Sequence, residues 1–252
     1  MTINPAQHWR NRLVFPAYCV AFFVSAAIVP SIVRLCAGRS RLADRCHLWS
    51  LKWGSRTILW LYGLELMATG NDLLPPDENF VVIANHTSWF DQIALLASSR
   101  HYLRFMVKAD YFKVPGLAYV MRLHNYVGVG KGTERAAAFA RAERLLRAGG
   151  NLVIYPEGTR AAGSELLPFQ KGAFMLAEST GRRLLPVYIA GAGSALPKAS
   201  RLSDTRRGTT LTVHWGKPFA ATNDQLSAAG LEQLRLAFAQ TLVSIAAPGM
   251  PA

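Results

Sequence analysis

The sequence predicts an α/β fold: a largely parallel, mixed sheet of about seven strands flanked by helices, with an N-terminal membrane-associated helical segment. Beyond about residue 66, short apolar runs alternate with amphipathic stretches, which is typical of strands and helices around a parallel sheet. Two of the apolar runs lead directly into polar clusters, as strands do at a ligand-binding rim. Residues 1–66 instead carry a long uncharged apolar run and an aromatic–basic stretch. We therefore expect membrane-associated helices in residues 1–66 and one α/β domain in residues 67–252.

Composition narrows the class of protein. A chain of 252 residues that is 51% hydrophobic and 17% charged is not disordered. Only one segment is apolar enough to enter a bilayer, which excludes a multi-span transporter. The 28 Lys and Arg against 15 Asp and Glu give a net charge of +13, so we expect an anionic partner: nucleic acid, a phosphorylated metabolite or anionic lipid.

The N-terminal part predicts two helices. Leu13 to Val33 has no charged residue and could cross a hydrocarbon layer of about 30 Å, although Pro16 and Pro30 shorten the uninterrupted helix. The second stretch, Leu48 to Leu66, mixes aromatic and basic side chains in the manner of a headgroup boundary, namely Trp49, Trp53, Trp60 and Tyr62 with His47, Lys52 and Arg56. We expect the first helix to dip into or through the membrane and the second to lie at its surface.

Two other interpretations of this part are a signal peptide and a pair of ordinary core helices. The apolar run is longer than a signal-peptide core and lacks a clean cleavage site. Four arginines follow the run (Arg34, Arg39, Arg41, Arg45) and two precede it (Arg10, Arg12), which would place the rest of the chain in the cytoplasm; a re-entrant hairpin would keep both ends there. The chain has three cysteines, an odd number, and we interpret them as reduced thiols: Cys19, Cys36 and Cys46. The expected location is the cytoplasmic face of the plasma (inner) membrane.

In the body, the expected strands are Glu65–Thr69, Phe80–Ala84, Leu103–Val107, Tyr126–Val129, Leu152–Tyr155, Leu184–Ile189 and Thr210–Trp215. The clearest helix starts with Thr133 as N-cap, places Phe139, Ala142 and Leu146 on one face and ends at Gly149-Gly150. A C-terminal amphipathic helix from Asn223 carries one apolar stripe: Leu231, Leu234, Phe238, Leu242 and Ile245.

The first polar cluster, residues 85–91, contains His86 and Asp91. Five residues apart on one helix they would face different ways, so the pair meets only if His86 lies in the turn and Asp91 in the first helical turn, with Ser88 as N-cap. A carboxylate there would fix the imidazole tautomer and leave its other nitrogen to take a proton from a substrate hydroxyl. The alternative is a capping-box variant, Ser88-x-x-Asp91, without catalysis.

The second cluster, residues 155–160, supplies an anion-binding complement. The guanidinium of Arg160 can donate two hydrogen bonds to phosphate oxygens, and Gly158 lets a ligand approach the backbone. Lys108, Lys131 and Lys171 occupy loop positions above the same sheet, although a solvated surface charge is the alternative for each lysine. Glu157 would orient Arg160 or bind a hydroxyl. Gly128 to Thr133 is a poor match to a phosphate-binding P-loop because Asn125 and Gly132 break it, and no histidine has metal-ligand spacing.

These clusters, in this order, resemble the glycerolipid acyltransferase family, whose best-known members are the 1-acyl-sn-glycerol-3-phosphate acyltransferases. Residues 85–91 match the family's first motif, His-x4-Asp; residues 155–160 match its third and residues 185–189 its fourth. Val107-Lys108-Ala109-Asp110 with Pro115-Gly116 resembles the segment after the first motif. The second motif departs, because Lys131 stands where the family usually has Arg and lacks the planar two-pronged contact.

The resemblance implies acyl transfer from acyl-CoA or acyl-carrier protein to a lysophospholipid hydroxyl, with neither metal nor further cofactor. It implies that His86 is the base, that Asp91 orients it, and that Pro186 belongs to the motif linked with the acyl donor. Holding the acceptor would fall to Glu157, Gly158, Thr159 and Arg160, with Lys131, Lys171 and Lys108. The membrane surface and its anionic lipid are the expected partners, and residues 67–252 form the acyltransferase domain.

Three alternatives remain. The acceptor could be another lysolipid, such as lyso-ornithine lipid, since Lys131 replaces Arg. The chain could instead be a non-catalytic basic membrane-binding protein. A nucleic-acid binder is disfavoured, because the aromatic residues cluster in apolar stretches instead of alternating with basic ones.

Overall fold

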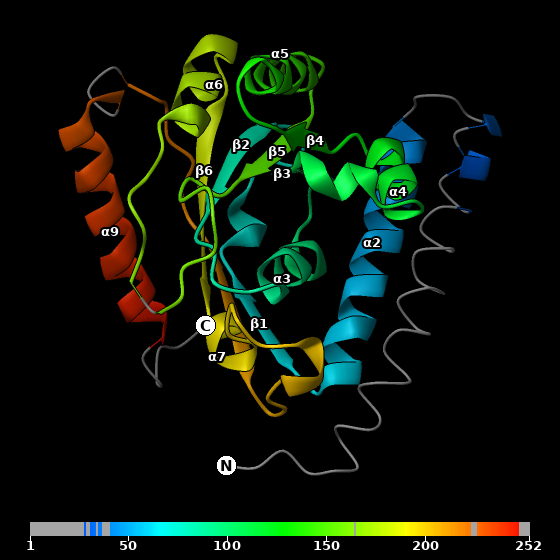
Figure 1. Ribbon diagram of the computed structural model, residues 1–252, viewed down its shortest axis with the longest axis vertical. Coiled ribbons are helices and arrows are strands. Elements are labelled where there is room, and N and C mark those ends of the chain that lie inside the picture. Colours follow the sequence, from blue (N-terminus) through cyan, green and yellow to red (C-terminus); the bar gives the residue numbers. More distant parts are fainter. Residues whose placement is uncertain are drawn as a thin grey trace.

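A seven-stranded sheet with helices on both faces forms the body of the protein (Figure 1). The computed structural model describes residues 28, 31–33, 35–36, 41–163, 165–222 and 226–246. The strand order is β1-β7-β6-β2-β5-β3-β4. The strands are β1 (Glu65–Thr69), β2 (Phe80–Ala84), β3 (Leu103–Lys108), β4 (Val127–Val129), β5 (Asn151–Ile154), β6 (Arg183–Ala190) and β7 (Thr210–Trp215).

The sheet is mostly parallel, which confirms the predicted α/β class with a largely parallel sheet of seven strands; membrane association of the N-terminal segment stays a prediction. Strands β6, β2, β5, β3 and β4 are parallel neighbours, so their carboxyl ends open at one rim. Only the β6–β7 pair is antiparallel, and β1 pairs parallel with β7. β1 and β7 therefore run toward the opposite rim, and Trp215 at the end of β7 pairs with Val187, level with Ala84 at the end of β2.

Strand positions follow the apolar runs closely. β1, β2 and β7 have the predicted bounds, and the other four differ by one residue at one end or at both ends. Every residue of β2 is buried, because the strand sits between β6 and β5 with helices on both faces. Asn85 fastens the end of β2 to β6: its side chain donates to the Ile189 carbonyl and accepts the Ile189 N–H, each at 2.8 Å.

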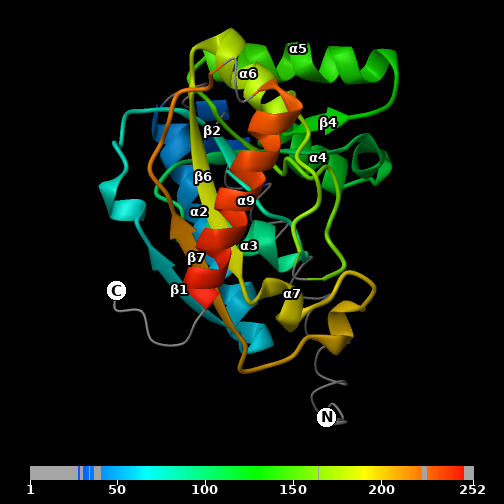
Figure 2. The ribbon, with the colours of Figure 1, turned by 90° about the vertical axis from the view of Figure 1, so that its left-hand side faces the viewer.

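Two hydrophobic cores lie on the two faces of the sheet. One packs α2, α3 and α7 against it, and the other packs α5, α6 and α9. Figure 2 shows α9 lying along β6, with α5 and α6 near one end of it. The helices are α2 (Arg41–Tyr62), α3 (Phe90–Ser98), α4 (Leu117–Leu123), α5 (Thr133–Arg147), α6 (Gly172–Thr180), α7 (Ala192–Ala195) and α9 (Ala228–Ala246), with short 3-10 turns η1 (Asn71–Leu73), η2 (Ala109–Lys113) and η3 (Leu202–Asp204).

Helix α5 begins one residue earlier in the capping scheme than the sequence predicted. Gly132 is its N-cap, with φ of 55°, and Thr133 is the first helical residue. The left-handed φ before the helix suits glycine, so no side-chain cap forms. The buried face consists of Ala138, Ala142 and Leu146, with Phe139 packed partly against the same core.

The C-terminal helix α9 packs one stripe on the second core. Phe238 is buried, and Leu231, Leu234 and Leu242 are partly buried against it. Its predicted start at Asn223 lies outside the described residues.

Helix α2 corresponds to the predicted second N-terminal helix and has two different faces. Leu51, Ile58, Leu59 and Tyr62 pack into the core shared with α3, so α2 is integral to the body. The helix ends before Gly63, whose φ is 63°. Most of the predicted first helix, residues 13–33, lies outside the described residues. Among the described helices, none has the length and apolar content needed to span a bilayer.

Candidate active site

His86 lies in the loop after β2, at the rim where the parallel strands end, and Asp91 lies in the first turn of α3. The His86 Nδ1 atom is 2.8 Å from Asp91 Oδ2. Asp91 is fully buried, whereas the His86 side chain is 21% exposed. Because an ionised carboxylate can only accept, the proton belongs on Nδ1, and Nε2 keeps its lone pair. This arrangement can take a proton from a hydroxyl placed at Nε2.

Asp91 also holds the turn that carries the histidine. Its Oδ2 atom accepts the backbone N–H groups of Thr87 and Ser88, at 2.6 and 2.8 Å. Ser88 is not the N-cap that the sequence predicted: Trp89 occupies that position without a side-chain cap. The Ser88 hydroxyl instead donates to the Leu196 carbonyl at 2.8 Å. The same hydroxyl accepts the N–H of Phe90, the first residue of α3, at 3.3 Å. The Asp91 carboxylate serves the two amides that precede the helix.

Tyr155 stacks on the catalytic candidate. Its ring and the His86 imidazole are 3.9 Å apart at their centroids, with 13° between their planes. Burial, with smaller contributions from Asp91 and Tyr126, raises the pKa of Tyr155 well above its usual value, so the phenol stays neutral. The hydroxyl is buried and has no hydrogen-bond partner among the described residues. The ring thus acts as a flat wall that limits the orientation of the imidazole.

Glu157 joins the two polar clusters. One carboxylate oxygen accepts the His86 N–H at 2.8 Å, and the other accepts the Leu167 N–H at 2.9 Å. Burial raises the pKa of Glu157, while the hydrogen bonds from Leu167 and His86 oppose that shift. A further backbone bond, from Ala161 N to His86 O at 2.7 Å, fixes the same junction. With both carboxylate oxygens occupied, Glu157 positions the His86 loop.

Arg160 is the cation nearest to this junction along the chain. Its guanidinium carbon lies 5.3 Å from the centre of the Trp89 ring, and its Nη1 atom is buried without a partner among the described residues. An unpaired guanidinium nitrogen is free to receive an anion. Gly158 and Thr159 precede it on an exposed turn. The φ of 70° at Gly158 requires glycine, while a Cβ there would meet only Gln170 at 4.0 Å.

The remaining predicted residues are more dispersed. Lys171 is the exposed N-cap residue of α6, directly after Gln170, whose N–H donates to Pro156 O. Lys108 and Lys131 line a groove along β4, described below. Pro186 is buried within β6, opposite Ile83, and its carbonyl accepts the Gly216 N–H. Its missing N–H fits its place just before the β6–β7 ladder begins at Val187.

Sequence reasoning missed three contributors to this site. Tyr155 was predicted as the end of a strand and the first residue of the second cluster, and Trp89 and Asn85 as members of the first motif, with no role for any of the three side chains. Each acts across the sheet on a segment distant in sequence: Tyr155 on His86, Trp89 on Arg160, and Asn85 on Ile189. An aromatic residue beside each motif was the available signal.

Comparison with known proteins identifies the class. The family described as Acyltransferase matches residues 65–190, half of the chain and the whole span from β1 to the end of β6. The chain therefore belongs to the acyltransferase family and is an enzyme of that class.

Within that family, the chain is similar to 1-acyl-sn-glycerol-3-phosphate acyltransferases. It is 28% identical over 232 residues to such a protein of Chlamydomonas reinhardtii, covering 91% of this chain and 68% of the relative. It is 29% identical to a chloroplastic protein of the same description from Brassica napus, covering 75% of this chain but only 57% of the relative. The crystal structure of the 1-acyl-sn-glycerophosphate acyltransferase PlsC from Thermotoga maritima shares the fold, with a TM-score of 0.75, 23% identity, and coverage of 94% and 98% of the two chains.

Proposed function

We propose that this enzyme transfers a fatty acyl chain from a thioester, acyl-CoA or acyl-carrier protein, to the free hydroxyl of 1-acyl-sn-glycerol-3-phosphate, giving phosphatidic acid. The observation that carries the proposal is the His86–Asp91 pair, fastened at the open rim beside the loop that ends in Arg160. The relatives described as 1-acyl-sn-glycerol-3-phosphate acyltransferases support this acceptor.

The reaction needs one proton to move twice. His86 Nε2 takes the proton of the acceptor hydroxyl as its oxygen bonds to the thioester carbonyl carbon. The carbon–sulfur bond then breaks, and the imidazolium returns the proton to the leaving thiolate. Asp91 stabilises the imidazolium between these steps, because its buried carboxylate accepts the Nδ1–H.

Cations hold the acceptor phosphate in this proposal. Arg160 contributes first, since its Nη1 atom lacks a partner among the described residues. Gly158 and Thr159 lie on the same exposed turn, and Lys171, Lys108 and Lys131 add positive charge along the rim. Glu157 acts through the His86 backbone, and Pro186 through the shape of β6.

Membrane contact belongs to the same proposal. On α2, Trp49, Trp53 and Trp60 are 64%, 52% and 73% exposed, opposite the residues that pack into the core. Their spacing places them on one helix face, and tryptophan favours the headgroup boundary. We propose that this face rests on the cytoplasmic surface of the inner membrane, where the acceptor lipid resides.

The test is an activity matrix of purified full chain, in mixed micelles, with two donors and a panel of lysolipids. We expect turnover of lysophosphatidic acid, lost on His86→Ala, with His214→Ala, in β7 two strands from β2, as a control. No turnover of lysophosphatidic acid with either donor would overturn the acceptor. Turnover only of lyso-ornithine lipid would favour the other acceptor. Acyl transfer retained by His86→Ala would overturn the base.

A further inference from the structure

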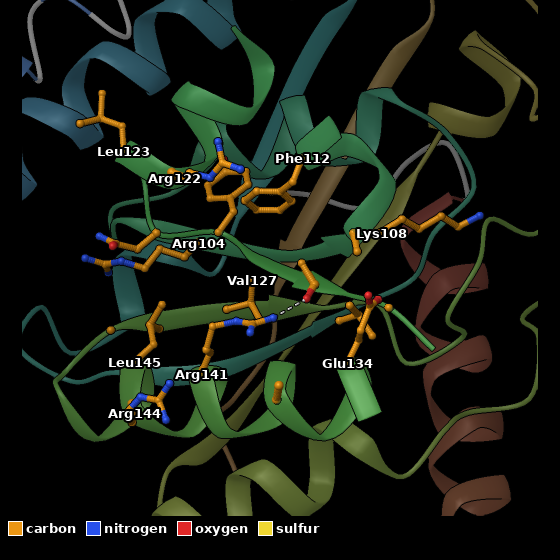
Figure 3. A pocket seen from close by; sticks show the side chains of 18 of the residues that line it. Arg104, Lys108, Phe112, Arg122, Leu123, Val127, Glu134, Arg141, Arg144 and Leu145 are labelled. Carbon is orange, nitrogen blue, oxygen red and sulfur yellow. Dashed lines mark hydrogen bonds between the residues drawn. The ribbon is translucent and has the colours of Figure 1, made fainter. Parts of the chain in front are cut away.

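A broad basic groove runs along the free edge of β4, away from the His86 loop. It has a volume of about 2050 Å³, and its walls come from α5 on one side and from β3, η2 and α4 on the other (Figure 3). Seven Lys and Arg line it against three Asp and Glu. We call it the edge groove. Its charge and volume exceed what one small phosphate ester needs.

Four arginines face one another across the edge groove. Arg104 and Arg122 extend from one wall, and Arg141 and Arg144 from α5 on the other (Figure 3). Arg122 and Arg144 are exposed, and their guanidinium groups make no hydrogen bond or ion pair with the part of the chain that the structure describes; that of Arg122 lies 5.9 Å from the centre of the Phe112 ring. Arg141 donates to the Gly128 carbonyl at 3.0 Å.

Arg104 is built into the wall. The residue is 9% exposed, and its guanidinium lies 4.2 Å from the centre of the Tyr102 ring. Its ion pair with Asp44 is 3.3 Å long, and that carboxylate is 54% exposed. A largely buried guanidinium with one long, solvated partner retains positive charge directed at the groove.

The position of the four arginines excludes the acceptor phosphate as their ligand. β4 is three strands from β2, which carries His86, and three steps of about 4.8 Å place the groove about 14 Å away across the sheet. In 1-acyl-sn-glycerol-3-phosphate, the phosphate is on the carbon next to the one bearing the reacting hydroxyl. An acceptor whose hydroxyl lies at His86 cannot place its phosphate among these arginines.

Acyl-CoA has the geometry that the acceptor lacks, because a long, flexible pantetheine arm separates its phosphates from the reacting thioester. Resting on the proposed acyl transfer, we infer that the edge groove binds the nucleotide phosphates of the CoA donor. Lys108, the last residue of β3, and Lys131, just after β4, line the end of the groove at the same rim as the His86 loop. The arm would pass there toward the imidazole.

The shape of the groove favours a nucleotide over a carrier protein. Opposed arginines suit a narrow anion with oxygens on several sides, since each guanidinium can grip two phosphate oxygens. A folded carrier protein would present a convex acidic surface, which would reach the outer arginines but not the largely buried Arg104. Carrier-protein binding is therefore the competing outcome of the test.

The test compares two arginine variants of the full chain in calorimetric titrations. Arg122→Gln/Arg144→Gln removes both unpaired guanidinium groups, and Arg135→Gln is the matched control, an exposed arginine of α5 outside the groove. CoA and adenosine 3′,5′-bisphosphate should bind the wild type and the control equally, and the double variant about ten-fold more weakly. Pantetheine, which has no phosphate, should not bind. In turnover, the KM for acyl-CoA should rise about ten-fold while kcat and the KM for the lysolipid stay unchanged.

Three results would overturn the inference: unchanged CoA affinity in the double variant and in Arg144→Glu, a KM increase for the lysolipid instead of the CoA donor, or a loss confined to acyl-carrier protein. Thermal melting verifies that the variants are folded. Direct CoA binding separates this inference from the proposed function. If CoA binding depends on the arginines but no acyl transfer is found, the CoA site is supported and the proposed function is overturned. If acyl transfer is found but does not depend on the arginines, the proposed function is supported and the CoA site is overturned.

Discussion

The imidazole of His86 lies nearly flat on the ring of Tyr155, with centroids 3.9 Å apart and planes 13° apart. The two residues come from neighbouring parallel strands, β2 and β5, whose ends lie side by side. The imidazole is therefore held by a carboxylate at Nδ1 and by a ring against its face. Turning the imidazole away from this orientation would break either the hydrogen bond with Asp91 or the stacking contact with Tyr155.

Tyr155 should matter for its ring and not for its hydroxyl. Tyr155→Phe keeps the stack and removes a buried hydroxyl that has no partner among the described residues, so we expect kcat within three-fold and a free energy of unfolding unchanged or up to about 1 kcal/mol higher. Tyr155→Leu keeps apolar volume but loses the stack, and kcat should fall about ten-fold at unchanged KM. Steady-state kinetics and urea unfolding measure both effects. Equal kcat in the two variants would contradict a role for the ring.

Asp91→Asn tests charge separately from geometry. The amide oxygen can replace Oδ2 as acceptor for His86, Thr87 and Ser88, so the turn should keep its shape. Without the negative charge the imidazolium loses its stabilisation, and we expect kcat to fall by about 10²–10⁴. Asp72→Asn, an exposed acid at the opposite rim, serves as the control. Retention of wild-type kcat in Asp91→Asn would show that Asp91 only caps the turn.

Glu157 should give the protein a distinct pH dependence. Burial raises the pKa of Glu157 above its ordinary value of 4.5, so the folded protein binds this proton more tightly than the unfolded chain. Between the ordinary and the raised pKa, the wild-type free energy of unfolding should therefore fall as the pH rises. Glu157→Gln lacks this titration. The difference in unfolding free energy, wild type minus variant, should decrease as the pH rises above the ordinary pKa of 4.5 in urea titrations; an increase would contradict the direction of the shift.

Glu157→Gln should also lose activity, because an amide has one acceptor oxygen for two backbone N–H groups. Either His86 or Leu167 then faces an NH2 group, and the loop between β2 and α3 shifts.

Trp89 should act on acceptor affinity through Arg160. The guanidinium lies 5.3 Å from the ring centre, and the Tyr111 ring makes an edge-on contact with the indole at 5.8 Å. Trp89→Ala releases the guanidinium, so the KM for the lysolipid should rise about three- to five-fold, with kcat within two-fold. Trp89→Phe retains a ring and should recover most of the affinity. A change in kcat alone would place Trp89 in the chemistry instead.

The sequence predicted those features that depend on local pattern. The bounds of β1, β2 and β7 follow directly from apolar runs. The proximity of His86 and Asp91 follows from a strand-to-helix turn between them. Neither needs knowledge of which strands are neighbours.

The features that escaped prediction depend on strand order. Glu157 was expected to orient Arg160 or bind substrate, yet it accepts two backbone N–H groups because β2 and β5 pair directly. The edge groove exists because β4 is the last strand and pairs only with β3. Chain order gives no indication of these neighbours.

Because β7 runs antiparallel to β6, the segments that follow β1 and β7 leave the sheet in the opposite direction from the loops that carry the candidate site. Segments that follow β1 and β7, including η1 with the 76%-exposed Leu73, emerge on the side remote from the imidazole. A fluorophore or immobilisation tag placed at η1 would therefore report on the enzyme, or tether it, without obstructing substrate traffic.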